Sequence, residues 1–438
     1  MQPFTELKAY ESESIVPDIV EGYIMGEISI LLQNLGNTSI SDLQAKVVST
    51  NDTTVKPVLS LKNPNKILPP GELEQVQFAL TFEDTNQPKA SLVLLVAIYS
   101  PSHKVAVQVR LLVRIREQSE PFKYSYIDSD GTRQLAVATR PKEECSFSTK
   151  CPVVLVMRGG GASILELADY FPAQVDGWTV VPAARTIVPF ETSPLIENSS
   201  MYAIYGLADL IVGTAPLYLK YQVNFQSIFA VGSQYTGGKA AISFANHHPD
   251  KIIGVSADSG WVKHGEPRTD DFVNPILNSL LSVSTIEDDF TFSIANLKSI
   301  PILAGVGKGD VGGFPWRINY EQGLFKSNGI EVKTDPHLGD GFKSDTAVAP
   351  TGEVLSFIEK RLAKKKLLPK SFQIQAWNPA SYDGRGGIRI LAKEIFISVA
   401  AIDVNIMRDE WTLQTTNVKT FQFTGQLFLS CFHRWLFI

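Results

Sequence analysis

The sequence predicts an α/β fold between two β-rich segments, and three observations carry this prediction. An apolar run from Ile228 to Val231 breaks at Gly232 and continues as a small-residue helical pattern from Lys239 to Ala245, which indicates a strand, a tight turn and a helix. Strand-like runs separated by turn residues fill residues 1–116, and alternating apolar residues return after Lys366. With 438 residues, 44% of them hydrophobic, the chain is long enough for two to three domains.

The amino-terminal segment, residues 1–116, is predicted to form an antiparallel β-sandwich. Its turns Asn34-Leu-Gly-Asn-Thr38 and Leu68-Pro-Pro-Gly71 resemble those of immunoglobulin-like domains. The expected strands lie within 26–40, 43–48, 67–80, 91–99 and 104–115. Residues 116–141, with the turn Asp128-Ser-Asp-Gly131, indicate a linker followed by a hairpin that leads into the α/β core.

The strand, turn and helix around residue 232 have the pattern of a nucleophile elbow. Such a turn reads G-x-S-x-G, because the nucleophile is held in strained backbone geometry and only small neighbours let helix and strand approach. With Gly237 and Gly238 as the glycine pair, Tyr235 stands where the serine is expected and Ser233 where the first glycine is expected. Two residues of the motif are therefore replaced.

Over roughly residues 120–365 the chain resembles the prolyl-oligopeptidase-like branch of the α/β-hydrolases. The elbow Ser233-Gln-Tyr-Thr-Gly-Gly238 is followed by His248-Pro-Asp250 and by a strand ending at Trp261, as in that family. Four further stretches follow the family's order, namely 152–162 with the oxyanion loop, 177–185, 300–310 with the acid, and 329–342 with the base. The resemblance implies a doubly wound, mostly parallel sheet over residues 117–366.

Carried over position by position, the resemblance puts the nucleophile at Tyr235, the acid at Asp310 and the base at Phe342. Only the acid keeps a suitable side chain, and a triad needs a base that takes the nucleophile's proton. The family's oxyanion region corresponds to Arg158, Gly159, Gly160 and Thr236. The first hypothesis is therefore an inactive homologue that binds a peptide, ester or glycan.

Substitute residues give the alternative hypothesis, an active serine peptidase or carboxylesterase. Ser233 lies in the same turn, and His337 lies five residues before the expected base, so these two with Asp310 could form a displaced triad. Tyr235 is either a nucleophile or an aromatic plug in a vacated pocket. Arg158 either binds an anion or pairs with Asp310.

Composition argues against several partners. The net charge is −5 and the one basic run is Lys364-Lys-Lys366, which disfavours nucleic acid and anionic membranes. Gly305 to Asp310 lacks phosphate-loop spacing, and Gly159 to Gly161 lacks the dinucleotide fingerprint. Histidines and cysteines show no zinc-site spacing, so we expect neither a metal nor a cofactor. No stretch is long enough to span a bilayer.

Sequons at Asn37, Asn51 and Asn198, with the close pair Cys145 and Cys151, favour a secreted or lumenal glycoprotein whose leader is missing from this chain. The alternative is a cytoplasmic location, because no signal peptide is visible.

After residue 366 we expect a small β-rich domain, residues 367–438. Its expected strands lie at 372–377, 388–392, 395–402 and 418–423. Three interpretations of the apolar end, Phe428 to Ile438, are left open by the sequence: a buried strand, a truncated domain or an altered reading frame.

Overall fold

The computed structural model describes residues 6–437 except 84–87, 89, 146–147, 158–163, 171–174, 184–193, 214–219, 233, 259–273, 278–285, 287–288, 306–314, 335–349, 351, 365, 408–409 and 425–434. By compactness the chain divides into two units. The first contains residues 1–150, 180–185 and 198–223, and the second contains the rest. The three-domain division expected from the sequence stays a prediction.

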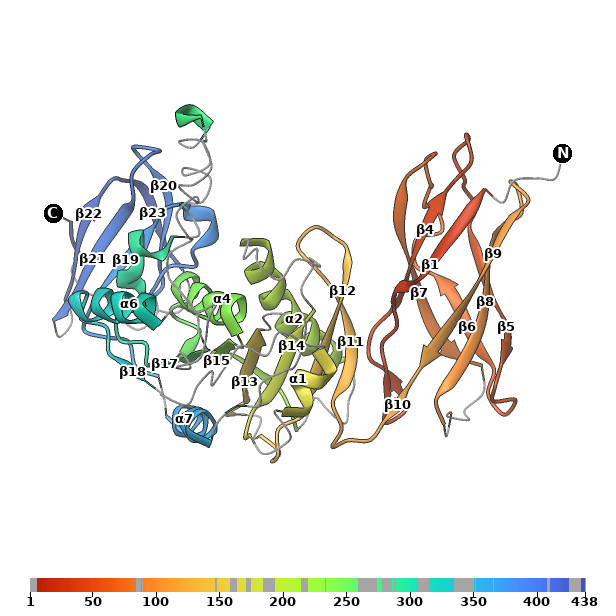
Figure 1. Ribbon diagram of the computed structural model, residues 1–438, viewed down its shortest axis with the longest axis horizontal. Helices are drawn as coiled ribbons and strands as arrows, with labels where there is room; N and C mark the ends of the chain where they lie inside the picture. The colour runs from red at the N-terminus through yellow and green to blue at the C-terminus, as the bar shows by residue number, and fades with distance from the viewer. Residues whose placement is uncertain are drawn as a thin grey trace. The chain divides into compact units, whose positions relative to one another are not determined.

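The amino-terminal segment forms two antiparallel sheets around one hydrophobic core (Figure 1). One sheet has the order β1 (Leu7–Ile15), β4 (Ile28–Asn34), β7 (Leu73–Phe82), β6 (Pro57–Leu61), and the other β5 (Gln44–Thr50), β8 (Leu92–Ser100), β9 (Val105–Val113). Short strands β10 (Ile115–Arg116), β2 (Ile19–Val20) and β3 (Tyr23–Ile24) pair in a third sheet. Alternate residues of β4, such as Ile28, Ile30 and Leu32, are buried in the common core, which explains the alternation in the sequence.

The central sheet has eight strands in the order β11 (Phe122–Ile127), β12 (Arg133–Thr139), β14 (Trp178–Pro182), β13 (Cys151–Met157), β15 (Val223–Gly232), β16 (Ile252–Asp258), β17 (Ile302–Gly305), β18 (Val332–Thr334). The first pair is the predicted hairpin and is antiparallel, whereas β15 to β18 pair parallel. Renumbered along the chain, this order is 1-2-4-3-5-6-7-8, the order of the α/β-hydrolase fold. The predicted fold class of this segment is thereby confirmed, whereas its assignment to the prolyl-oligopeptidase-like branch stays a prediction.

Helices α4 (Gln234–His247) and α7 (Gly352–Leu362) cover opposite faces of this sheet (Figure 1). Gly232 of β15 meets α4, whereas the Phe229 ring packs edge-on against Phe357 of α7, with centroids 5.8 Å apart. Positions 229 and 232 are an odd number of residues apart, so they face opposite sides of the strand. The buried residues of α7 are Val354, Phe357 and Ile358, the i, i+3, i+4 spacing of one helix face.

Helices α1 (Ile164–Tyr170), α2 (Pro194–Val212) and α6 (Pro315–Ser327) also belong to the described chain. Helix α2 packs on the first hairpin, where the Tyr124 hydroxyl donates to the Ala203 carbonyl at 2.7 Å. The Tyr126 and Ser199 hydroxyls lie 2.9 Å apart. Cys145 and Cys151 are disulfide-bonded. Within the described helices, none has the length and apolar character needed to cross a membrane.

The carboxy-terminal segment is β-rich. Strands β19 (Ser371–Ala376), β21 (Ala400–Met407), β22 (Glu410–Thr416) and β24 (Trp435–Phe437) form one sheet, and β20 (Ile388–Lys393) pairs with β23 (Val418–Phe423). The strand expected at 395–402 is wrong in its first half. Residues 395–398 form a turn in which Phe396 is 82% exposed, because Asn417 donates to the carbonyls of Ile395 and Ser398 and holds the turn outward.

Candidate functional site

The turn between β15 and α4 is built on an unusually close approach of strand and helix. A Cβ on Gly232 would lie 2.2 Å from the Gly237 carbonyl oxygen and 2.5 Å from the Gly238 Cα. These are backbone atoms, so only glycine fits at the end of the strand. The predicted glycine pair therefore does contact the strand, but its partner is Gly232, which the sequence analysis had treated only as the strand break.

Gly232 and Gly237 enclose four residues, one more than the three residues between the glycines of the G-x-S-x-G motif. Gly232 and Gly237 are five positions apart, whereas the motif glycines are four apart. Strand β15 ends at Gly232 and helix α4 begins at Gln234, so Ser233 is the single residue between them in the sequence. Tyr235 is the second residue of α4, and Thr236, the predicted oxyanion residue, is buried.

Most of the other predicted site residues lie outside the described residues, as does Ser233 itself: Arg158, Gly159, Gly160, Asp310, His337 and Phe342. The strands that precede them are described. Parallel strands end at a common edge, and β17 ends at Gly305, five residues before Asp310, while β18 ends at Thr334, three residues before His337. The chain therefore reaches the same edge of the sheet a few residues before Asp310 and again a few residues before His337.

One acidic residue at this edge was missed by the sequence analysis. Asp258 is the last residue of β16 and pairs in register with Gly305 of β17, while its neighbour Ala257 pairs with Gly232 of β15. An aspartate that ends an apolar strand was visible in the run Ile253 to Asp258, and strand order alone shows that it lies beside the elbow. Asp258 is therefore a second candidate for the acid.

Helix α4 also carries a buried lysine that the sequence analysis missed. Lys239 is 1% exposed, and its Nζ lies 5.8 Å from the centroid of the Phe290 ring. An ammonium over an aromatic face is stabilised by the ring's negative potential. In the described ranges, no group of three His, Cys, Asp or Glu side chains could hold a metal ion.

The motif His248-Pro-Asp250 has a structural role at the opposite end of α4. The helix has 14 residues and is about 21 Å long, so this end is remote from the elbow. His248 Nδ1 lies 2.6 Å from the Asp383 carboxylate, which also accepts a hydrogen bond from Lys251. Burial lowers the pKa of His248 against the opposing effect of Asp383, so the neutral ring donates through Nδ1. Burial alone would raise the pKa of Asp383, but the hydrogen bonds from His248 and Lys251 hold it well below its usual range.

The same motif makes two further contacts, through the backbone carbonyl of Pro249 and through the carboxylate of Asp250, its one acidic residue. The Gly386 N–H donates to the Asp250 carboxylate at 2.7 Å, and Lys366 Nζ donates to the Pro249 carbonyl. Burial lowers the pKa of Lys366 to about 7, although the Asp250 charge acts in the opposite direction. Arg385, 2% exposed, donates to the Lys298 carbonyl at 2.8 Å. These contacts dock the β-rich segment on the hydrolase-fold core.

Comparison with known proteins gives structural similarity only. No protein-family model matches the chain, and no curated protein matches it. Similar solved structures include a ferulic acid esterase, 15% identical over 56% of this chain and 96% of that chain, with a TM-score of 0.38. A structure from work on two Rhizomucor miehei esterases is 14% identical over 56% of this chain and 82% of its own, with a TM-score of 0.37.

An S-formylglutathione hydrolase from Agrobacterium tumefaciens is 17% identical over 55% of this chain and 91% of its own, with a TM-score of 0.34. Scores this low carry no argument about activity. The assignment to the α/β-hydrolase fold therefore depends on the strand order and the elbow of this chain itself.

Proposed function

We propose that the protein is a serine hydrolase that cleaves carboxylic esters, with Ser233 as its nucleophile. The observation that carries this proposal is the position of Ser233 in the sequence, alone between the last residue of β15 and the first residue of α4. In α/β-hydrolases the nucleophile occupies the sharp turn between strand and helix. Tyr235, one residue inside the helix, is less suited to this role.

The remaining roles follow from the same edge of the sheet. His337 would take the Ser233 proton as the hydroxyl oxygen attacks the ester carbonyl, and Asp310 or Asp258 would orient the imidazole. The alcohol leaves with that proton, and water then releases the acid from the acyl-enzyme and restores Ser233. The N–H groups of the first turn of α4 have no partners within the helix, so they can stabilise the oxyanion.

The test is hydrolysis of p-nitrophenyl acetate and p-nitrophenyl butyrate by the full chain and by three variants. Ser233→Ala should lose turnover by about 10³-fold or more, because it removes the nucleophile. Tyr235→Phe removes the rival hydroxyl and should keep turnover within about threefold. His337→Gln should lose activity comparably to Ser233→Ala.

Two results would overturn the proposal. Loss of turnover in Tyr235→Phe with retention in Ser233→Ala would return the nucleophile to Tyr235. Absence of turnover in a folded wild-type protein would favour the inactive, ligand-binding homologue.

A further inference from the structure

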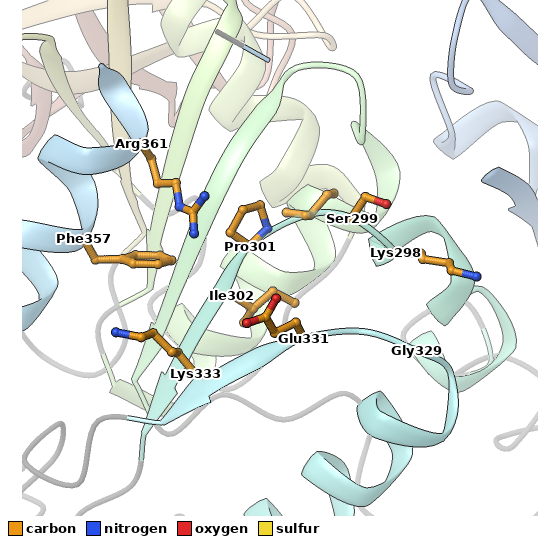
Figure 2. A pocket seen from close by; sticks show the side chains of 10 residues that line it. Lys298, Ser299, Pro301, Ile302, Gly329, Glu331, Lys333, Phe357 and Arg361 are labelled. Atoms are coloured by element: carbon orange, nitrogen blue, oxygen red, sulfur yellow. The ribbon is translucent and has the colours of Figure 1, made fainter. Parts of the chain in front are cut away.

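A charged pocket lies at the edge of the central sheet opposite the elbow. Residues Lys298 to Pro301 lead into β17, and Gly329 and Glu331 lead into β18, so the pocket opens at the amino ends of these strands. Helix α7 closes it with Phe357 and Arg361 (Figure 2). The cavity has a volume of about 350 Å³. The proposed ester-cleaving site lies at the carboxyl ends of the same strands, so the pocket is distinct from it.

The pocket carries more positive than negative charge. Lys298, Lys333 and Arg361 line it together with one carboxylate, Glu331. Lys333 is also 3.7 Å from Glu353, but both side chains are largely exposed and such a pair is weak. Figure 2 shows the Arg361 guanidinium and the Lys333 ammonium on either side of the Phe357 ring. The three cations therefore come from α7, from β18 and from the segment before β17, rather than from one solvated helix face.

Arg361 has hydrogen-bonding capacity that the described residues leave unused. Its guanidinium carbon lies 5.0 Å from the centroid of the Phe357 ring, which fixes the side chain against the wall of the pocket. Its Nε is buried and has no hydrogen-bond partner among the described residues. Four other arginines of the described chain, Arg133, Arg140, Arg385 and Arg389, also have a buried Nε without a partner, so the case for a ligand depends on the place of the Arg361 guanidinium at the pocket wall and not on this atom.

The mouth of the pocket is held in place from outside. The Lys298 carbonyl accepts a hydrogen bond from Arg385, and the Lys298 N–H donates to the Ala295 carbonyl at 3.1 Å. Ser299, the next residue, has φ of 72°, a left-handed conformation that costs a non-glycine residue free energy. Ile302 and Phe357 beneath are buried in the core. The cations therefore project from a pre-organised frame, which lowers the entropic cost of binding.

We propose that this pocket binds a small phosphate ester. The planar, multi-donor Arg361 guanidinium suits phosphate oxygens, and Lys298 and Lys333 supply further positive charge. Glu331 disfavours a bare anion but accepts hydrogen bonds, so the organic part of the ligand carries hydroxyl groups that donate to it. A hydroxylated phosphate ester, of which a sugar phosphate is the simplest example, satisfies both requirements within the volume of the cavity.

Isothermal titration of the full chain with glucose 6-phosphate, inorganic phosphate and glucose, at constant ionic strength, tests the proposal. Glucose 6-phosphate should bind at least fivefold more tightly than inorganic phosphate, and glucose should not bind. Arg361→Gln should weaken glucose 6-phosphate binding by about 10-fold or more, and Lys333→Gln by about threefold to 10-fold. Lys333 is 64% exposed, so its variant should fold even if the Arg361 variant does not.

Two controls separate a built site from general attraction between charges. Lys360→Gln removes an exposed cation from the last turn of the same helix, outside the pocket, and should change affinity less than twofold. Glu331→Gln should weaken glucose 6-phosphate relative to inorganic phosphate. The proposal is overturned if neither phosphate binds at 10 mM, or if Lys360→Gln weakens binding as much as Lys333→Gln does.

Discussion

Replacing Gly232 with alanine should separate the end of β15 from the start of α4. The new Cβ would lie 2.2 Å from the Gly237 carbonyl oxygen, 2.5 Å from the Gly237 carbonyl carbon and 2.5 Å from the Gly238 Cα. All three are backbone atoms, so no side chain can rotate away and the helix itself has to move by about 1 Å. Overpacking of this kind costs about 1–3 kcal/mol, which lowers Tm by about 2–12 °C in a domain of this size.

The same displacement should affect catalysis more than stability. The turn carries Ser233 and leads into the first N–H groups of α4, and a shift of about 1 Å can cost about 100-fold in rate. The assays are thermal unfolding by circular dichroism and hydrolysis of p-nitrophenyl acetate, both on Gly232→Ala.

Helix α6 offers a matched control. A Cβ at Gly323, inside this helix, would meet nothing within 4 Å, so Gly323→Ala should raise stability by about 0.5–1 kcal/mol and leave turnover unchanged. If Gly232→Ala kept both the Tm and the turnover of the wild type, the close approach at Gly232 would not be what holds the elbow.

Three further substitutions test the docking of the carboxy-terminal segment and the first hairpin. The pKa of Lys366 is about 7 in the folded protein against an ordinary 10.5, so the unfolded chain binds more protons between these values and stability should rise from pH 7 to pH 10. Lys366→Met should abolish that rise in Tm, whereas exposed Lys364→Met should keep it. The pKa of Asp383 is held low, so Asp383→Asn should lower the free energy of unfolding by about 1–3 kcal/mol at pH 7, measured by urea unfolding. This difference from wild type should shrink below about pH 4, because the Asp383 carboxylate of the unfolded wild-type chain is protonated there. Gly206→Ala would put a Cβ 2.3 Å from the Tyr126 Cβ and should lower Tm; an unchanged Tm would show that α2 can shift freely on the hairpin.

The sequence predicted the strands and the fold class of the core well, because strands buried on both faces of a parallel sheet carry short continuous apolar runs, such as Ile228 to Val231 of β15. The exposed turn at Ile395–Ile397 was predicted as a strand, because consecutive apolar side chains look alike whether a sheet buries them or Asn417 holds them outward. The hydrogen bonds of Asn417, and not the hydropathy of residues 395–397, determine that this segment is a turn.

Long-range packing explains what the sequence could not provide at the site. The role of Gly232 follows from its backbone contact with Gly237. The sequence alone does not show whether residue 232 or residue 233 takes the place of the motif's first glycine. The partners His248 and Asp383 are 135 residues apart in the chain, so nothing local indicates that the HPD motif docks another segment. Asp258 is a candidate for the catalytic acid only because β16 lies beside β15 in the sheet, and the sequence does not show this strand order.

The most direct test of the account is to find which residue reacts with a fluorophosphonate probe. Labelled protein is digested, and the adduct is located by tandem mass spectrometry within the peptide that spans β15 and α4. If Ser233 is the nucleophile, the probe should leave a single adduct on Ser233 that is absent from Ser233→Ala and unchanged in Tyr235→Phe. An adduct on Tyr235, or a folded protein that takes no label, would contradict this assignment.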